Sequence, residues 1–166
     1  MRTCLVGSEM CIRDSSLTAT AGSINDGADD STVDFTAGGL ITLTAQDEIG
    51  VLGSGTDTDL EFAASSSVNV STTGTGAIDL DGLGALTLSD VDTANGAITV
   101  TSAGALTVTD VASGTNGNIS LTTSSGDITG LATVNAGSGN VTLNSAGAIV
   151  DDSDASTVVT GGVLTA

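Results

Sequence analysis

The stretch GAITVTSAGALTV, residues 96–108, decides the fold of this 166-residue chain. It carries the motif Gly-x-(Ile/Leu/Val)-x-(Leu/Val/Ile) twice, once around Ile98 and once around Leu106. A doublet of the same kind occurs at residues 76–88, 117–128 and 139–149. Self-similarity at a fixed period of this length predicts a stacked-repeat architecture.

The apolar positions of these doublets return about every twenty residues. The leading residues are Ile78, Ile98, Ile119 and Val141, and their partners eight or nine residues later are Leu86, Leu106, Ile128 and Ile149. A third apolar position follows some doublets at Val91, Val111 and Leu131. Two earlier pairs, Ile41 with Ile49 and Leu60 with Val68, each precede the next pair by 18 or 19 residues. We expect about six to seven coils of 18–22 residues.

Each repeat alternates apolar residues with Thr, Ser or Asp, which predicts strands with one buried and one solvated face. Hairpins of a sandwich would also give short strands with regular turns. Hairpins do not explain why residues of the same class recur every twenty residues rather than every eight. A coil of twenty residues is about 66 Å around, enough for three short strands and three corners. We therefore predict an all-β fold, a parallel β-helix (β-solenoid).

The first fifteen residues differ in composition from the rest. They contain both cysteines, Cys4 and Cys11, and both basic residues of the chain. Residues 5–15 resemble a translated transposase sequencing adapter, so we interpret residues 1–15 as an artefactual, unstructured segment. We expect residues 16–39 to form an irregular or incomplete first coil, and residues 40–166 to form a repeat array truncated at its C-terminus.

The formal net charge of −18 resides in residues 16–166, which contain no Lys, Arg or His. Such a chain has no cation with which to neutralise phosphates, so we expect no nucleic-acid partner. It has no run of eighteen apolar residues either, so we expect no membrane insertion. High negative charge favours solubility and attracts counter-ions.

Aspartates provide the candidate metal ligands. Asp90 and Asp110 each follow a doublet leucine by four residues, so a solenoid places them about one strand spacing apart. Their repulsion is relieved by a raised pKa or by a bound cation. Asp151, Asp152 and Asp154 form a second oxygen-rich group of the kind that Ca²⁺ requires. Calcium is thus the single candidate cofactor, and solvated turns are the alternative interpretation.

Catalysis has little support in these residues. The repeat region has neither histidine nor cysteine, which excludes Ser-His and Cys nucleophile chemistry. Glycoside hydrolysis needs only two carboxylates, but aromatic residues for sugar stacking are absent after Phe62. We expect a protein that is not an enzyme, with a fragment of a polysaccharide-degrading β-helix enzyme as the remote alternative.

Residues 102–108 and 136–143 resemble the repeats of filamentous-haemagglutinin-type exoproteins and related large bacterial adhesins, and the resemblance covers roughly residues 40–166. It implies a right-handed β-helix exported to the cell surface. We expect a structural spacer of a secreted or cell-surface bacterial adhesin, located extracellularly or on the bacterial surface. Its expected partners are neighbouring repeats of the same longer chain and host or environmental surface glycans. A calcium- or glycan-binding module is the alternative.

Overall fold

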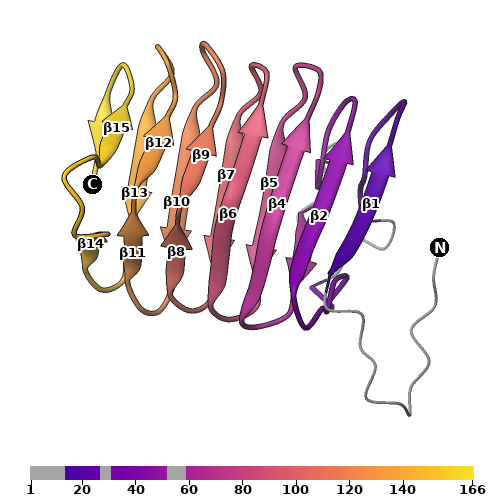
Figure 1. The fold of residues 1–166 in the computed structure, drawn as a ribbon, viewed down its shortest axis with the longest axis horizontal. Coiled ribbons are helices and arrows are strands. Elements are labelled where there is room, and N and C mark those ends of the chain that lie inside the picture. Colours follow the sequence, from indigo (N-terminus) through magenta and orange to yellow (C-terminus); the bar gives the residue numbers. More distant parts are fainter. Residues whose placement is uncertain (1–13, 27–30, 52–58) are drawn as a thin grey trace.

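The computed structural model describes residues 14–26, 31–51 and 59–166. Every regular element in these ranges is a β-strand, so the predicted all-β fold is confirmed. The strands stand side by side along a rod, from β1 near the N-terminus to β14 and β15 near the C-terminus (Figure 1). No helix of the described residues has the length and hydropathy to cross a membrane. The predicted artefactual segment, with Cys4 and Cys11, lies outside the described residues except for Asp14 and Ser15.

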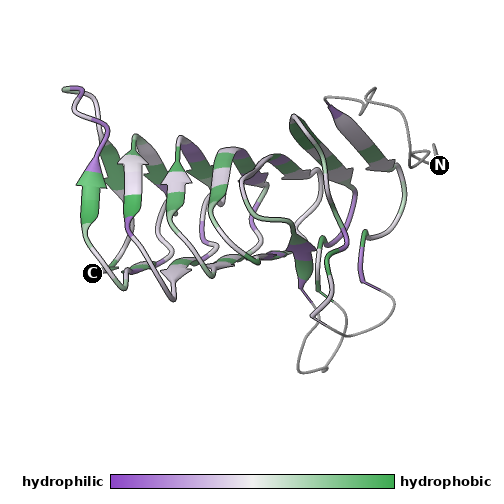
Figure 2. Ribbon diagram, turned by 90° about the horizontal axis from the view of Figure 1, so that it is seen from below, coloured by the Kyte–Doolittle hydropathy of each residue, from purple (hydrophilic) through white to green (hydrophobic). Residues whose placement is uncertain are grey.

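The strands form two sheets, which Figure 2 shows as opposite walls of one stack. Sheet A has ten strands: β1 (Ser15–Ala19), β2 (Leu40–Ala45), β4 (Ser66–Thr72), β6 (Leu86–Thr93), β8 (Leu106–Val108), β9 (Asp110–Ala112), β11 (Ile128–Leu131), β12 (Thr133–Asn135), β14 (Ile149–Asp151) and β15 (Val158–Thr160). Sheet B has six: β3 (Leu60–Phe62), β5 (Ile78–Gly82), β7 (Ile98–Ser102), β10 (Ile119–Thr123), β13 (Val141–Asn144) and β16 (Leu164–Thr165).

All strand pairs of the described residues are parallel, and from β2 onward the chain alternates between sheet A and sheet B. The predicted parallel β-solenoid is therefore confirmed, with about five turns. Sheet B aligns the leading apolar residues Ile78, Ile98, Ile119 and Val141 in one continuous row. Sheet A aligns Leu86, Leu106, Ile128 and Ile149 in a second row. All of them except Ile149 are at most 1% exposed, so the twenty-residue period is the period of the hydrophobic core.

The predicted register of the first coils is wrong. Ile41 pairs with Val68 on sheet A and not with Leu60, which pairs with Leu80 on sheet B. The first two coils are therefore 26 and 27 residues long, whereas the later coils have 20 to 23, apart from the step of 25 residues between β12 and β15. These longer coils leave about five turns instead of six to seven.

The third apolar position is also shifted. Val91 pairs with Val111, as predicted, but Val111 pairs with Val134. Leu131 lies opposite Asp151 instead, because the register shifts between Ile128 and Leu131. Gly130 adopts a φ of +59° within this irregular segment, a conformation that glycine adopts without steric cost. From β8 onward the wall of sheet A is broken into two short strands per coil, whereas β6 is one long strand.

Buried hydroxyl groups donate hydrogen bonds to backbone carbonyl groups in the corners that follow sheet A. Thr72 Oγ1 donates a hydrogen bond to the carbonyl oxygen of Gly76, 3.0 Å away. Thr93 repeats this contact with Gly96 at 2.8 Å, and Ser113 repeats it with Gly117 at 2.5 Å. Each corner thereby satisfies a backbone acceptor that would otherwise be costly to bury.

Candidate functional site

Asp90 and Asp110 are neighbours on the outer wall of sheet A. Val91 of β6 pairs with Val111 of β9, and each aspartate immediately precedes its valine. Burial and, after it, the charge of Asp90 raise the pKa of the Asp110 carboxyl above its ordinary value. On the other side of β6, Asn69 Nδ2 donates a hydrogen bond to Asp90 Oδ2 at 3.2 Å. The two candidate ligands thus face one another across a single coil-to-coil step.

Asp92 belongs to the same group, although the sequence analysis did not single it out. Burial, the side-chain hydrogen bond with Asp90 and the charges of Asp90 and Asp110 raise the pKa of Asp92 to about 6. The alternation Asp-Val-Asp in β6 is the signal that could have found it, since residues two apart share a face of a strand. We call Asp90, Asp92 and Asp110 the sheet A acidic cluster.

Asp151 is the last residue of β14, and Asp152 and Asp154 lie in the exposed connection from β14 to β15. Asp151 Oδ1 accepts a hydrogen bond from Thr157 Oγ1, and Asp152 Oδ1 accepts one from the backbone amide of Asp154 at 3.0 Å. Hydrogen bonds from the Ser156 hydroxyl and backbone amide lower the pKa of Asp154. These carboxylates therefore organise their own loop.

The structure does not bring the predicted metal ligands into one site. Asp110 pairs with Thr133, and Thr133 pairs with Val158, so the 151–154 loop belongs to a coil two steps farther along the rod. Within the described ranges, no three or more Asp, Glu, His or Cys side chains are arranged as a metal-binding group. Calcium binding at either place stays a prediction.

A second acidic cluster lies on the outer face of sheet B. Leu60 pairs with Leu80 and Glu61 pairs with Asp81, and this register places Asp59 beside Asp79. Glu61 is fully buried, and its backbone amide donates a hydrogen bond to Asp34 Oδ2 at 3.1 Å. We call Asp59, Glu61, Asp79 and Asp81 the sheet B acidic cluster; the sequence analysis did not predict it, because it misplaced Leu60.

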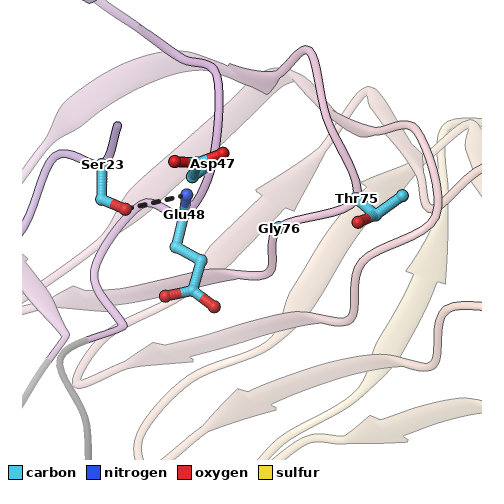
Figure 3. A pocket seen from close by; sticks show the side chains of 5 residues that line it. All are labelled: Ser23, Asp47, Glu48, Thr75 and Gly76. Carbon is cyan, nitrogen blue, oxygen red and sulfur yellow. Dashed lines mark hydrogen bonds between the residues drawn. The ribbon is translucent and has the colours of Figure 1, made fainter. Parts of the chain in front are cut away.

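A shallow polar hollow lies at a corner of the N-terminal coils (Figure 3). It is lined by Ser23, Asp47, Glu48, Thr75 and Gly76. Ser23 Oγ accepts a hydrogen bond from the backbone amide of Glu48 at 3.2 Å, which Figure 3 shows as a dashed line. The hollow is thus lined by two carboxylates and two hydroxyl groups, which offer oxygen atoms to a ligand.

No family model, curated protein or solved structure matches this chain. Function must therefore be inferred from the regular coil geometry and from the two acidic clusters.

Proposed function

We propose that this chain is a structural spacer of a secreted or cell-surface bacterial adhesin. The unbroken in-register row Ile78, Ile98, Ile119 and Val141 is the observation that carries the proposal. Four successive coils place an aliphatic side chain at the same buried position, and the same corner hydrogen bond recurs at Thr72, Thr93 and Ser113. Uniform stacking of this kind extends a rod by a constant step for each added coil, as a spacer requires.

A stacked array supplies length in proportion to the number of coils. Each coil contacts only the coils next to it, so stability is close to a sum of nearest-neighbour terms. Each coil adds about 4.8 Å to the rod, the distance between hydrogen-bonded strands. We infer that its partners are neighbouring repeats of a longer chain, and that the whole adhesin contacts host or environmental surface glycans. Its location would be the extracellular space or the bacterial surface, where the net charge of −18 keeps the rod soluble.

Removing two whole coils tests the spacer proposal. Deletion of residues 77–117 joins Gly76 to Asn118 and preserves the order of sheet B and sheet A segments. We expect this variant to unfold cooperatively and to be shorter by about 10 Å in small-angle scattering. The deletion also removes the whole sheet A acidic cluster and two of the four residues of the sheet B cluster, so a fold that depends on either cluster would be lost.

The matched control removes residues 77–107, which is one and a half coils. This deletion leads the chain from a corner before sheet B directly into sheet A, so we expect it to be unfolded by circular dichroism. If the deletion of two whole coils and the deletion of one and a half coils were equally folded or equally unfolded, the proposal of a modular spacer would be contradicted.

A calcium- or glycan-binding module is the second candidate, and the adjacency of Asp90 and Asp110 favours its calcium form. Calorimetric titration with Ca²⁺ and binding of the intact chain to a glycan array separate the two functions. A spacer gives no saturable glycan binding. Saturable binding that is lost in Asp90→Asn or Asp110→Asn, and retained in Asp47→Asn, would replace the spacer by the binding module. A polysaccharide-degrading fragment would require hydrolysis that disappears when one aspartate pair is changed.

A further inference from the structure

Two corners of the rod contain the dipeptide Asn-Gly. Asn95 precedes Gly96 in the corner between β6 and β7, and Asn116 precedes Gly117 in the corner between β9 and β10. Both asparagines are exposed to solvent. Glycine has no side chain to hinder its own backbone nitrogen, so this nitrogen readily attacks the side-chain amide of the preceding residue. Each corner therefore contains an amide that can be lost without an enzyme.

The reaction needs only water as a co-reactant. The backbone nitrogen of Gly117 forms a bond to Asn116 Cγ as the Cγ–Nδ2 bond breaks, and the proton of the backbone amide leaves with Nδ2 as ammonia. Water then opens the cyclic imide. Cleavage at Cγ gives aspartate, and cleavage at the main-chain carbonyl carbon gives isoaspartate. The asparagine side chain must first turn its Cγ toward the following nitrogen.

The next coil holds the side chain of Asn95 in place. Asn95 Oδ1 accepts one hydrogen bond from Thr115 Oγ1 and another from the backbone amide of Asn116, both at 2.9 Å. The second donor belongs to the main chain, so it cannot turn away as a side chain can. Rotation of the Asn95 amide toward the nitrogen of Gly96 breaks both bonds, which lowers the fraction of Asn95 that can react.

The side chain of Asn116 is held less firmly. Asn116 Oδ1 lies 2.5 Å from Ser138 Oγ, and the same hydroxyl group lies 3.0 Å from the carbonyl oxygen of Thr115. A serine hydroxyl has one proton to donate, so these two acceptors compete for it. Ser138 is also exposed, so water competes as well.

The corner between β9 and β10 is also longer than the corner between β6 and β7. Thr93 donates its hydrogen bond to Gly96, three residues later, whereas Ser113 donates to Gly117, four residues later. The longer corner contains Gly114, which has a φ of +64°. Glycine gives the backbone its greatest conformational freedom. Motion that frees the asparagine side chain is therefore easier in the longer corner.

We propose that Asn116 is a deamidation site of the folded rod, and that hydrogen bonds from the next coil protect Asn95, its counterpart in the preceding coil. Isoaspartate at position 116 adds a carbon atom to the main chain. The corner has no room for it, because a Cβ on Gly117 would already lie 1.9 Å from the carbonyl oxygen of Gly96. Isoaspartate therefore loosens the contact between the two coils, whereas aspartate adds a negative charge and keeps the backbone length.

Peptide mapping by mass spectrometry of the intact chain, incubated at neutral pH with and without urea, tests the proposal. In urea we expect equal conversion of Asn95 and Asn116, because both precede glycine. In the folded chain Asn116 should convert about fivefold faster than Asn95, the factor that corresponds to one net hydrogen bond. Asn118, which precedes the β-branched Ile119, is the slow reference. A folded-state rate at Asn116 no higher than that at Asn95, or conversion of Asn116 in urea alone, would overturn the proposal.

Two substitutions test the protection by the next coil. Thr115→Val removes one donor to Asn95 and should accelerate the conversion of Asn95 about fivefold. Ser138→Ala removes the hydroxyl group beside Asn116 and should bring its folded-state rate closer to the rate in urea. Thr99→Val, at an exposed position of β7, is the matched control and should leave both rates unchanged. If either variant fails to fold, the comparison of the two asparagines within the wild type decides. An unchanged Asn95 rate in folded Thr115→Val would contradict the protective role of the next coil.

Discussion

A Cβ atom on Gly96 would lie 2.0 Å from the carbonyl oxygen of Gly76 in the preceding coil. The corresponding distance is 1.9 Å from Gly117 to Gly96 and 2.2 Å from Gly139 to Gly117. Real Cβ atoms do not approach backbone oxygen this closely, so the coils touch backbone to backbone along this corner. The glycine that opens each doublet is therefore required by the stacking distance.

Gly96→Ala should destabilise the rod by about 1–3 kcal/mol, because the added methyl group must displace backbone rather than a flexible side chain. Thermal and urea denaturation measure the effect. Gly38→Ala is the matched control, since a Cβ there meets nothing within 4 Å. Similar loss of stability in both variants would show that the corner has room to relax.

Thr93→Val should lower the free energy of unfolding by about 1–2 kcal/mol, because it leaves the buried carbonyl oxygen of Gly96 without its hydroxyl donor. Thr99→Val is the control, since Thr99 is exposed on β7. Urea denaturation of both variants gives the comparison. A Thr93→Val variant as stable as the wild type would mean that water or a neighbouring amide replaces the hydroxyl.

Leu106→Ala should destabilise the chain by about 2–5 kcal/mol, because Leu106 is fully buried between Leu86 and Ile128 and a cavity would remain. Leu83→Ala, at a position that is 36% exposed, should cost much less. Chemical denaturation of the two variants tests the difference. An equal loss of stability in Leu106→Ala and Leu83→Ala would contradict a core made of aligned rows of apolar side chains.

Asp110→Asn should lower the pKa of Asp92 from about 6, because it removes one of the negative charges that raise this pKa. The pKa of Asp92 in the folded protein lies above its ordinary value of 3.8, so protonation of Asp92 stabilises the fold. This stabilisation is lost as the pH rises through about 6. Carboxyl ¹³C NMR titration measures the shift. Asp47→Asn should leave the titration of Asp92 unchanged, and an unchanged value in Asp110→Asn would show that the two charges do not interact.

Millimolar calcium should raise the melting temperature of the wild type relative to EDTA, since two adjacent carboxylates repel each other unless a cation lies between them. The double variant Asp90→Asn with Asp110→Asn should show no such increase. Differential scanning calorimetry at matched ionic strength checks it, with sodium chloride as the control for screening. Identical melting curves in calcium and in EDTA would remove calcium from the account.

The sequence predicts the regular coils well because each residue class has one role in them. Ile78, Ile98 and Ile119 recur at the same distance from a glycine that the corner requires, so spacing alone gives their register. The first coils could not be predicted in this way. Both sheets use the same alternation of aliphatic and polar residues, so nothing local assigns Ile41 to sheet A or Leu60 to sheet B.

The acidic clusters show a similar division. The adjacency of Asp90 and Asp110 follows from the twenty-residue spacing, which holds between β6 and β9. The sheet B cluster depends on the pairing of Leu60 with Leu80, which the sequence analysis missed because it aligned Leu60 with Ile78. Burial of Glu61, a charged residue in a short strand, has no sequence signal, because alternation places it on the outer face.

The hydrogen bonds between the parallel strands of successive coils run along the axis of the rod. Tension applied to the two ends of the chain therefore acts on one coil at a time, beginning with the outermost, instead of shearing all strands together. A released coil of about 20 residues supplies about 70 Å of extended chain. A rod built in this way would unwind turn by turn under a pulling force and would absorb mechanical work before its attachment broke.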